Sequence, residues 1–305
     1  MQDKKVLVTG ALGRIGNYII PGLSKKFSLT LLDVQKNNSK YNYIGPIAEA
    51  DLINPDRILY QSYFEGMDAV IHLGYKSRLN NPLDDFYDEI DNVKMAYNVL
   101  RTAYDTGVKR VVVASSNHAA DWYEHALLHS RKLEYVDPYD LPLSDNFYGW
   151  AKASYEHIGF LFACGFPNFQ DESGQENHVA PSQSSRKLEV VNVRIGAPRE
   201  IDVKRFVGDS SGYKRDLGAY VSSRDLTQLF ERSVEANDIN NEHGIPWQIV
   251  YGISDNTRAF WSLSNARSIL GYKPQDDSEV KFAKDIAKFL TDSNNDSPAG
   301  RLNLS

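Results

Sequence analysis

The 305-residue sequence contains a single cysteine, Cys164, so an internal disulfide is impossible and nothing points to an oxidising compartment. It has no signal-peptide pattern and no apolar run close to the roughly 18 residues that a membrane span requires. We therefore expect a soluble, cytoplasmic protein that does not bind membranes. The sequence also lacks an excess of basic residues, because 34 Lys and Arg stand against 40 Asp and Glu. The resulting net charge of −6 argues against nucleic acid as a partner.

What the sequence does contain is the composition of a globular protein, with 42% hydrophobic and 24% charged residues. The pattern around which the rest is organised lies in its first sixteen residues. Val6 to Val8 form an unbroken apolar run, as in a strand buried on both faces of a parallel sheet. Glycines at 10, 13 and 16 follow at once, and apolar residues at helical spacing then continue to Lys26. A strand, a glycine turn and a helix N-terminus in this order predict a site for a pyrophosphate.

The second predicted strand, residues 29–32, ends on Asp33. An acidic residue about 20 positions beyond the glycine turn is where a dinucleotide's adenosine ribose is held. Its carboxylate accepts hydrogen bonds from both ribose hydroxyls and repels a 2′-phosphate, which favours NAD over NADP. Arg14 lies inside the turn and could meet such a phosphate, so the choice of cofactor stays open on the residues alone.

Strands and helices alternate through most of the remaining sequence, which predicts an α/β, Rossmann-type doubly wound parallel sheet. Residues 1–196 would form the dinucleotide-binding domain with the catalytic residues, 197–290 a small C-terminal substrate lobe interleaved with it, and 291–305 a flexible tail. We expect residues 119–147 to form an irregular loop and 166–185 a polar surface insertion. Further strands are predicted at 44–50, 68–73, 109–114, 188–196 and 247–253, and helices at 55–64, 82–106, 146–162, 223–236, 264–270 and 281–290.

Candidate catalytic residues follow the fifth predicted strand, which delivers Ser116 to its carboxyl end, the edge where open α/β sheets bind ligands. Tyr148 and Lys152 lie four residues apart on the next predicted helix and so share one face. A phenol ordinarily keeps its proton up to about pH 10, but a nearby ammonium favours the phenolate. Tyr148 could then act as a general base towards a hydroxyl that loses hydride to nicotinamide. The alternative is an ordinary Tyr and Lys on an exposed helix face.

Together, the glycine turn, Asp33, Ser116, Tyr148 and Lys152 resemble the extended short-chain dehydrogenase/reductase family in type and order. The segment 114–118, the triplet His72-Leu73-Gly74 and the stretches 250–261 and 270–274 are similar to uronate dehydrogenases. Members of that family use NAD to oxidise the anomeric carbon of an aldohexuronic acid to a lactone. The resemblance therefore implies an NAD cofactor, a small anionic sugar substrate and a homo-oligomer, and it gives His72 a structural role.

The resemblance also implies roles for individual residues. Tyr148, Lys152 and Ser116 would be catalytic, with no metal. Substrate would bind to Ser77, Ser116, Asn117, His118, Tyr148 and Arg205, the last through the two parallel hydrogen bonds that a guanidinium makes with a carboxylate. The cofactor would contact Gly10, Leu12, Gly13, Arg14, Ile15, Gly16, Asp33, Asp51, Leu52, Leu73, Gly74, Tyr75, Asn92, Ala114, Tyr148, Lys152 and Ile195.

The sequence departs from the family after the sixth predicted strand, where Ala197 replaces a serine that helps to hold the carboxylate. The loop that follows carries Arg199, Lys204 and Arg205, more positive charge than a monocarboxylate needs. A relative oxidises glucose 6-phosphate with NAD, so a phosphate is the alternative anion. Two other classes stay open: a nucleotide-sugar epimerase and a non-catalytic NAD-sensing module. A dehydratase is disfavoured, because Asn117-His118 stand where dehydratases carry Asp-Glu.

Overall fold

The computed structural model describes residues 4–37, 46–79, 83–165 and 186–290. The predicted insertion 166–185 and the predicted tail lie outside these ranges. The chain divides into two compact units, each drawn from several segments. The first comprises Met1–Ala114, Ser154–Asn192 and Ser233–Gln248, and the second comprises Ser115–Ala153, Val193–Arg232 and Ile249–Ser305. The predicted division at residue 196 stays a prediction.

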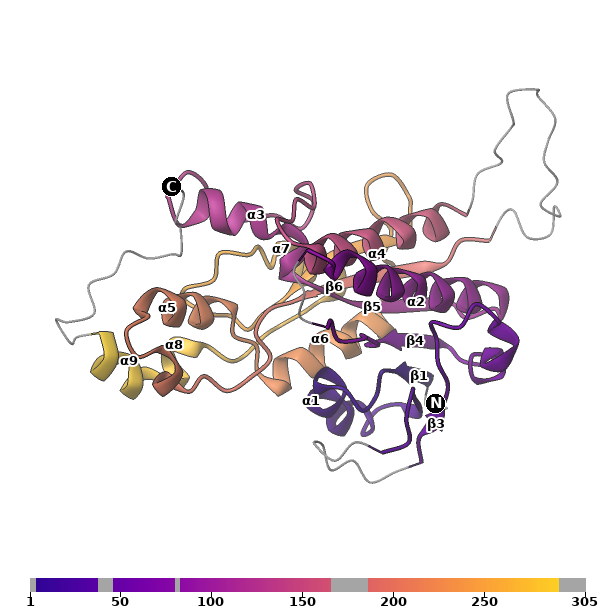
Figure 1. Cartoon of the computed structure of the whole chain (residues 1–305). Coiled ribbons are helices and arrows are strands. Elements are labelled where there is room, and N and C mark those ends of the chain that lie inside the picture. Colours follow the sequence, from indigo (N-terminus) through magenta and orange to yellow (C-terminus); the bar gives the residue numbers. More distant parts are fainter. Residues whose placement is uncertain (1–3, 38–45, 80–82, 166–185, 291–305) are drawn as a thin grey trace. The chain divides into compact units, whose positions relative to one another are not determined.

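A seven-stranded sheet has the strand order β3-β2-β1-β4-β5-β6-β7. Figure 1 labels β1, β3, β4, β5 and β6. β1 pairs in parallel with both β2 and β4, and β2 with β3 and β4 with β5 do the same. This confirms the predicted Rossmann-type α/β fold. The strands are β1 (Lys5–Thr9), β2 (Ser28–Asp33), β3 (Ala48–Glu49), β4 (Ala69–His72), β5 (Arg110–Ser116), β6 (Glu189–Ile195) and β7 (Trp247–Gly252).

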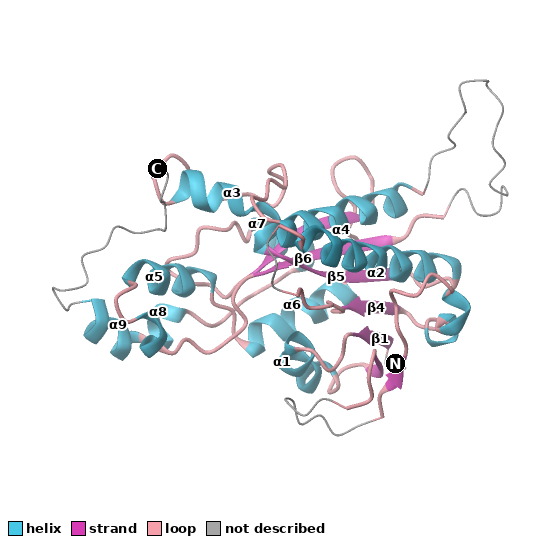
Figure 2. Cartoon of the chain, in the orientation of Figure 1, coloured by secondary structure: helices cyan, strands magenta, loops and turns pink. Residues whose placement is uncertain are grey.

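Helices connect the parallel strands, as they must when a chain returns to the same end of a sheet (Figure 2). α1 joins β1 to β2, and α2 joins β4 to β5. The helices are α1 (Arg14–Leu23), α2 (Asp85–Asp105), α3 (Asp121–Tyr123), α4 (Phe147–Cys164), α5 (Ser210–Ala219), α6 (Ser223–Glu235), α7 (Ser264–Leu270), α8 (Ser278–Lys281) and α9 (Ala283–Leu290). Among the described residues no helix is both long and apolar enough to cross a membrane.

The core of the first unit is built on the apolar strands, since Val6, Leu7 and Val8 of β1 are completely buried, as predicted. His72 ends β4 inside this core, where its Nδ1 lies 2.8 Å from the Thr9 hydroxyl. This contact fits the structural role expected for His72. A smaller core in the second unit packs α5 against the region of α8, through Ile201, Tyr213, Leu217, Tyr220 and Phe282.

Three of the predicted elements were wrong in detail. Residues 55–64 form two 3₁₀ turns, η1 (Arg57–Leu59) and η2 (Gln61–Tyr63), instead of a helix. The break falls at Tyr60, whose φ of −136° is not helical and whose hydroxyl donates to the Asn54 carbonyl at 2.9 Å. Of the predicted strand 44–50, the described part pairs only at Ala48–Glu49.

The segment 119–147 is also more regular than predicted. It begins inside the 3₁₀ turn η3 (Asn117–Ala120) and continues with α3 and a π-helical turn η4 (Glu124–Leu128). The helix α5 lies in a region where no helix was predicted. Its start is capped by Asp209, whose side chain accepts a hydrogen bond from the Gly212 N–H. Short elements such as η3, η4 and α5 depend on local contacts of this kind and leave little periodicity in the sequence.

Candidate active site

The glycine turn of the first unit has the geometry of a backbone cradle. Gly10 has a φ of +69°, and a Cβ there would lie 2.5 Å from the backbone nitrogen of Gly74. A Cβ at Gly16 would lie 2.1 Å from the Ala11 carbonyl oxygen. Gly13 is the N-cap of α1 and provides no side chain to cap the helix. No N-cap side chain therefore occupies the backbone N–H groups at the start of α1, which fits the predicted pyrophosphate site.

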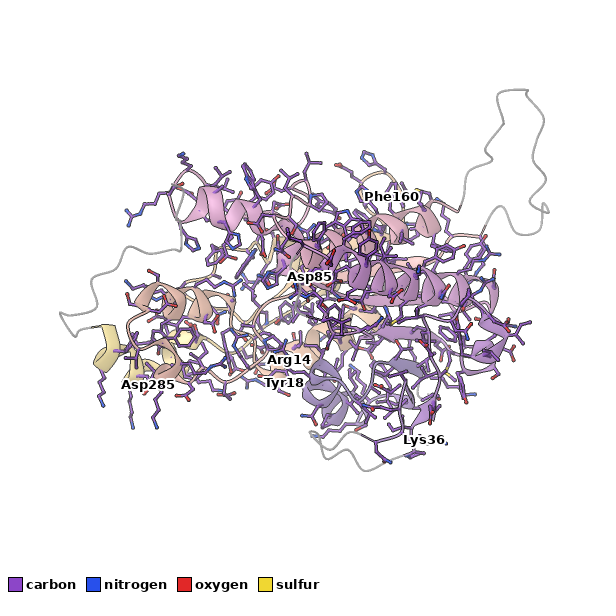
Figure 3. The ribbon with its side chains drawn as sticks, viewed as in Figure 1. Arg14, Tyr18, Lys36, Asp85, Phe160 and Asp285 are labelled. Atoms are coloured by element: carbon purple, nitrogen blue, oxygen red, sulfur yellow. The ribbon has the colours of Figure 1, made fainter. Side chains whose placement is uncertain are left out.

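The Asp33 carboxylate is hydrogen-bonded to the backbone of this glycine turn. Its Oδ2 accepts a hydrogen bond from the Leu12 N–H at 2.9 Å, and its Oδ1 accepts one from the Val34 N–H at 2.8 Å. Each oxygen keeps a second lone pair for a ribose hydroxyl. Arg14 lies exposed in the first turn of α1, one turn before Tyr18 (Figure 3). These residues fit the adenosine half of NAD.

The chain after β4 is fixed by a residue of α2. Asn92 is buried, and its Oδ1 accepts from the Lys76 N–H at 2.7 Å while its Nδ2 donates to the Lys76 carbonyl at 3.0 Å. Asn92 therefore holds the backbone between Gly74 and Ser77 in place. Tyr75 donates to Glu89 at 2.8 Å, and Ser77 is exposed.

The other cofactor residues predicted on the first unit are placed as follows. Leu52, Leu73 and Ala114 are buried, whereas Asp51 is exposed and its Oδ1 accepts from the Ile53 N–H at 2.9 Å. Ile15 is half-buried in α1. Contact of these residues with a dinucleotide stays a prediction.

In the second unit, the structure brings the predicted catalytic side chains together. The rings of His118 and Tyr148 meet edge to face, with centroids 5.4 Å apart. The Lys152 Nζ lies 5.6 Å from the centre of the Tyr148 ring, and Lys152 is only 4% exposed. Ser116 is buried at the end of β5, where its hydroxyl accepts a hydrogen bond from the His118 N–H. A buried cation beside a phenol favours removal of the phenol's proton.

Two residues that the sequence analysis did not single out support this group. A Cβ at Gly149 would lie 2.0 Å from the His118 carbonyl oxygen, so glycine lets α4 approach η3 closely. Asp121 is 1% exposed, and its Oδ2 contacts both the His118 Nδ1 and, at 3.2 Å, the Asn146 Nδ2. Asn146 in turn accepts from the Gly149 N–H at 2.9 Å. Asp121 thus connects the imidazole to the start of α4.

Asn117, a predicted sugar-binding residue, connects this group to α5. Its amide is oriented so that the nitrogen donates to the Ile195 carbonyl at 2.9 Å. Its oxygen then accepts from the Arg215 Nη2 at 2.8 Å. Arg215 therefore lies directly beside a predicted substrate residue, although the sequence analysis gave it no role. Its distance of almost 100 residues from Asn117 along the chain left no local signal.

Arg215 is also bound to a carboxylate of the chain. Its Nε donates to the Glu124 Oε1 at 2.8 Å and its Nη2 to the Glu124 Oε2 at 3.1 Å. Burial by itself would raise the pKa of Glu124, but the hydrogen bond from His129 and the charge of Arg215 outweigh it and lower the pKa to about 2. Burial likewise opposes the charge of Arg215, yet Glu124 raises the pKa of this guanidinium above its ordinary value. Both groups are charged at neutral pH.

The basic residues of the loop after β6, which were predicted to meet the substrate's anion, do not share the hydrogen bonds that Arg215 makes. Arg205 and Lys204 lie exposed on the 3₁₀ turn η5 (Val203–Phe206). Arg199 binds Asp216, with its Nη2 2.5 Å from the Asp216 Oδ2. Ala197 is buried, and its N–H donates to the Ala219 carbonyl. The substrate role assigned to Arg205 stays a prediction.

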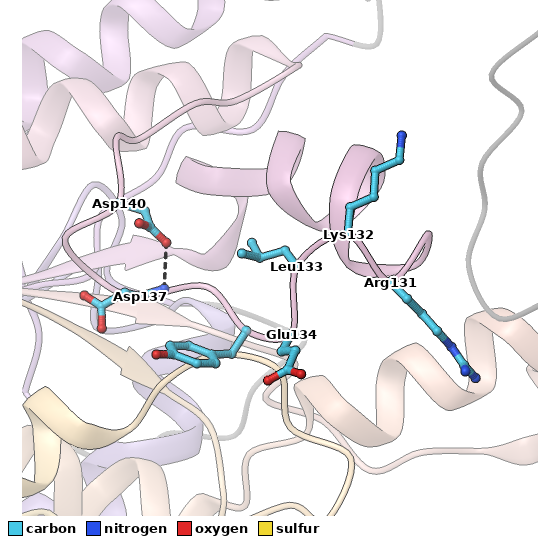
Figure 4. A pocket seen from close by; sticks show the side chains of 7 residues that line it. Arg131, Lys132, Leu133, Glu134, Asp137 and Asp140 are labelled. Carbon is cyan, nitrogen blue, oxygen red and sulfur yellow. Dashed lines mark hydrogen bonds between the residues drawn. The ribbon is translucent and has the colours of Figure 1, made fainter.

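The second unit has two other features of the kind that can bind a ligand or a metal. A surface hollow is lined by residues 131–135 with Asp137 and Asp140, and Asp140 accepts from the Asp137 N–H at 2.9 Å (Figure 4). None of the predicted site residues lines it. Ligand atoms of Asp121, Glu124 and His125 lie within 4.8 Å of one another, as in a metal site. Since Arg215 already binds both Glu124 oxygens, a cation there would meet a guanidinium. Neither feature includes Ser116, Tyr148 or Lys152, the predicted catalytic residues.

Comparison with known proteins agrees with this geometry. Residues 6–160 match the model of the NAD dependent epimerase/dehydratase family. The chain belongs to that family. It is 30% identical over 297 residues to an NAD-dependent glucose-6-phosphate dehydrogenase of Haloferax volcanii, covering 90% of this chain and 95% of the relative. It is 27% identical to a uronate dehydrogenase of Pseudomonas syringae pv. tomato, covering 92% of this chain and 85% of that protein.

A solved structure supports the same relationship. The crystal structure of uronate dehydrogenase from Agrobacterium tumefaciens is 26% identical, with a TM-score of 0.69 over 95% of this chain and 90% of the other. The predicted resemblance to uronate dehydrogenases is therefore confirmed. The family's dependence on NAD likewise confirms the predicted cofactor.

Proposed function

We propose that the chain oxidises the anomeric hydroxyl of a sugar to a lactone, with Tyr148 as the general base. The family of the chain and its relatives already make it an NAD-dependent sugar dehydrogenase. The observation that supports Tyr148 as the general base is its ring in contact with both His118 and the buried Lys152.

NAD, when bound, supplies a two-electron acceptor that takes the hydride from the anomeric carbon. Gly10, Gly13 and the start of α1 would hold its pyrophosphate, and Asp33 its adenosine ribose. The anomeric hydroxyl loses its proton to the Tyr148 oxygen as the carbon–oxygen double bond of the lactone forms. Atoms and charge balance, because the hydroxyl gives up one proton and the carbon one hydride.

The neighbours of Tyr148 would bind and orient the sugar. Ser116 would donate a hydrogen bond to the reacting oxygen, and Lys152 would keep the phenolate available. Asp121 fixes the His118 ring and thereby the edge that this ring presents to Tyr148. Such fixed groups lower the barrier because they need no rearrangement during the reaction.

The test is the formation of reduced cofactor when the purified chain is mixed with NAD and a panel of sugars. The panel contains the hexuronates and glucose 6-phosphate, the two substrate classes expected from the sequence, together with the unmodified hexoses. Reduction of NAD with lactone as the product supports the proposal. Absence of reduction with every sugar overturns it. A homo-oligomeric assembly and a cytoplasmic location stay predictions.

A further inference from the structure

The guanidinium beside the predicted sugar residues is already paired with an internal carboxylate. Both oxygens of Glu124 accept hydrogen bonds from Arg215, at 2.8 Å and 3.1 Å. Two parallel bonds of this kind are how an arginine binds a free carboxylate. Glu124 thus occupies, at this guanidinium, the place that the carboxylate of an acidic sugar would take.

The charges around Arg215 leave no surplus of positive charge. The carboxylate side chains of Glu124, Asp216 and Asp121 are 3%, 6% and 1% exposed, so water screens them little. Two guanidinium groups face them, because Arg215 binds Glu124 and Arg199 binds Asp216. The three carboxylates thus outnumber the two guanidinium groups that face them. A further anion bound at Arg215 would add to this excess of negative charge.

One nitrogen of Arg215, with its two N–H groups, is still available. Its Nη1 lies 3.6 Å from the Asp216 Oδ1, beyond hydrogen-bond distance, and makes no hydrogen bond to the described residues. The Arg215 side chain is 22% exposed. The two N–H groups of Nη1 belong to a guanidinium whose charge is already neutralised by Glu124, so they suit a hydroxyl oxygen better than a carboxylate or a phosphate, which is bound most strongly by a net positive charge.

Resting on the proposed dehydrogenase function, we infer that the substrate is an uncharged aldose, and that Glu124 excludes sugars that carry a carboxylate or a phosphate. Glu124 does so in two ways: it takes the paired donors of Arg215, and its charge repels an anion. Glu124 is a specificity residue and takes no part in proton or hydride transfer. The exposed Lys204 and Arg205 do not reverse this preference, because solvent-exposed charges contribute little.

The experiment compares sugars that differ only at carbon 6. Values of kcat/KM are measured for glucose, glucuronate and glucose 6-phosphate, and for galactose with galacturonate, using the unsubstituted chain and NAD. In the glucose or the galactose series, we expect kcat/KM for the neutral sugar to exceed kcat/KM for its anionic partners about 100-fold. This is the size of effect that a like charge at a buried site produces. Glu124→Gln keeps the shape but removes the charge, and we expect it to narrow this ratio about tenfold or more. Glu134→Gln, which changes an exposed glutamate of the same segment, is the control.

The outcomes separate the inference from the proposed function. An anionic sugar oxidised as well as its neutral partner overturns the inference and leaves the dehydrogenase function standing. No reduced NAD with any sugar overturns both. If Glu124→Gln folds but leaves the ratio unchanged, Glu124 does not exclude the anion. If that variant does not fold, the comparison of sugars on the unsubstituted chain still decides which class is preferred.

Discussion

The Lys152 Nζ lies 5.6 Å from the centre of the Tyr148 ring, one helical turn away and almost wholly buried. His118 makes an edge-to-face contact with the same ring and is fixed by Asp121. The phenol is therefore oriented by neighbours from two different elements, α4 and η3. This arrangement makes the Tyr148 hydroxyl the group whose loss should affect the chemistry most directly.

Tyr148→Phe removes that hydroxyl and keeps the ring with its packing. We expect kcat to fall by about 10²- to 10⁴-fold, the usual contribution of a positioned general base, with the fold and the affinity for NAD unchanged. Initial rates with saturating NAD and sugar measure the loss. Tyr135→Phe is the matched control, since Tyr135 is 55% exposed. Full activity in Tyr148→Phe would mean that Tyr148 is not the general base, whereas no activity in the unsubstituted chain would favour a non-catalytic, NAD-sensing module.

The glycines of the cofactor turn allow a comparison of conformational strain with steric clash. Gly10 and Gly66 both have a positive φ, of +69° and +72°, but a Cβ at Gly66 would meet nothing within 4 Å. Gly66→Ala should therefore cost only the strain of about 1–2 kcal/mol. Gly10→Ala should cost more and also weaken NAD binding, because its Cβ would meet the Gly74 backbone. Urea unfolding and NAD titration measure the two effects, and equal losses at both sites would contradict the steric explanation.

The sequence was sufficient for features whose causes are local. The glycine turn, the strand β1 and the position of Asp33 follow from residue types within about 30 positions, and the structure has each in the predicted order. The pairing of Arg215 with Glu124 and Asn117 could not be predicted in this way. It depends on how α5 packs against η3 and η4, which are far from it in sequence. Arg205 was predicted instead because it is the nearest match in the sequence to the arginine that follows the sixth strand in uronate dehydrogenases.

Short elements were missed for a related reason. A long helix such as α2 has enough turns to show an apolar period, whereas the turns at 57–63 and 117–128 have one or two. Their conformation is decided by single contacts, such as the hydrogen bond from the Tyr60 hydroxyl to the Asn54 carbonyl. Sequence periodicity carries no information about such contacts.

The pair His125 and Asp145 should make stability depend on pH. Their Nδ1 and Oδ2 atoms lie 2.5 Å apart. Burial lowers the pKa of His125, but the hydrogen bond to Asp145 outweighs it, so the pKa rises above its ordinary 6.5. Burial raises the pKa of Asp145, but the hydrogen bond from His125 outweighs it, so the pKa falls below 3.8.

The signs give a pH window for this pair. Because the pKa of His125 is raised in the folded state, His125 contributes stability below pH 6.5, and this contribution is lost as the pH rises through the folded pKa. Because the pKa of Asp145 is lowered in the folded state, Asp145 contributes stability above pH 3.8, and this contribution is lost as the pH falls through the folded pKa. His125→Gln should therefore destabilise most between these two values and least at pH 9. Urea unfolding at pH 5 and pH 9 tests this, with His243→Gln as a control for loss of an exposed imidazole. An equal loss at both pH values would mean that the pair does not act through charge.

Asp225 should be the most sensitive acidic residue in the fold of the second unit. It is completely buried, and its Oδ2 accepts from the Ser254 hydroxyl at 2.7 Å and from the Asp276 N–H at 3.0 Å. Its Oδ1 accepts from the Gln275 N–H at 2.9 Å. The carboxylate thus ties α6 both to the chain leaving β7 and to the segment before α8.

Asp225→Asn would keep the shape but replace one acceptor oxygen with an amide nitrogen, which must face at least one N–H or O–H donor. A buried donor without an acceptor costs about 1–3 kcal/mol, and more where a charged partner is lost, so we expect a loss of about 2–4 kcal/mol in the free energy of unfolding. Asp255→Asn is the matched control, because Asp255 binds Arg267 at 2.6 Å but is 58% exposed, and exposed pairs contribute about 0–1 kcal/mol. Denaturant unfolding measures the free energy of unfolding of both variants. A similar small loss of this free energy in the two would mean that the buried carboxylate is replaceable.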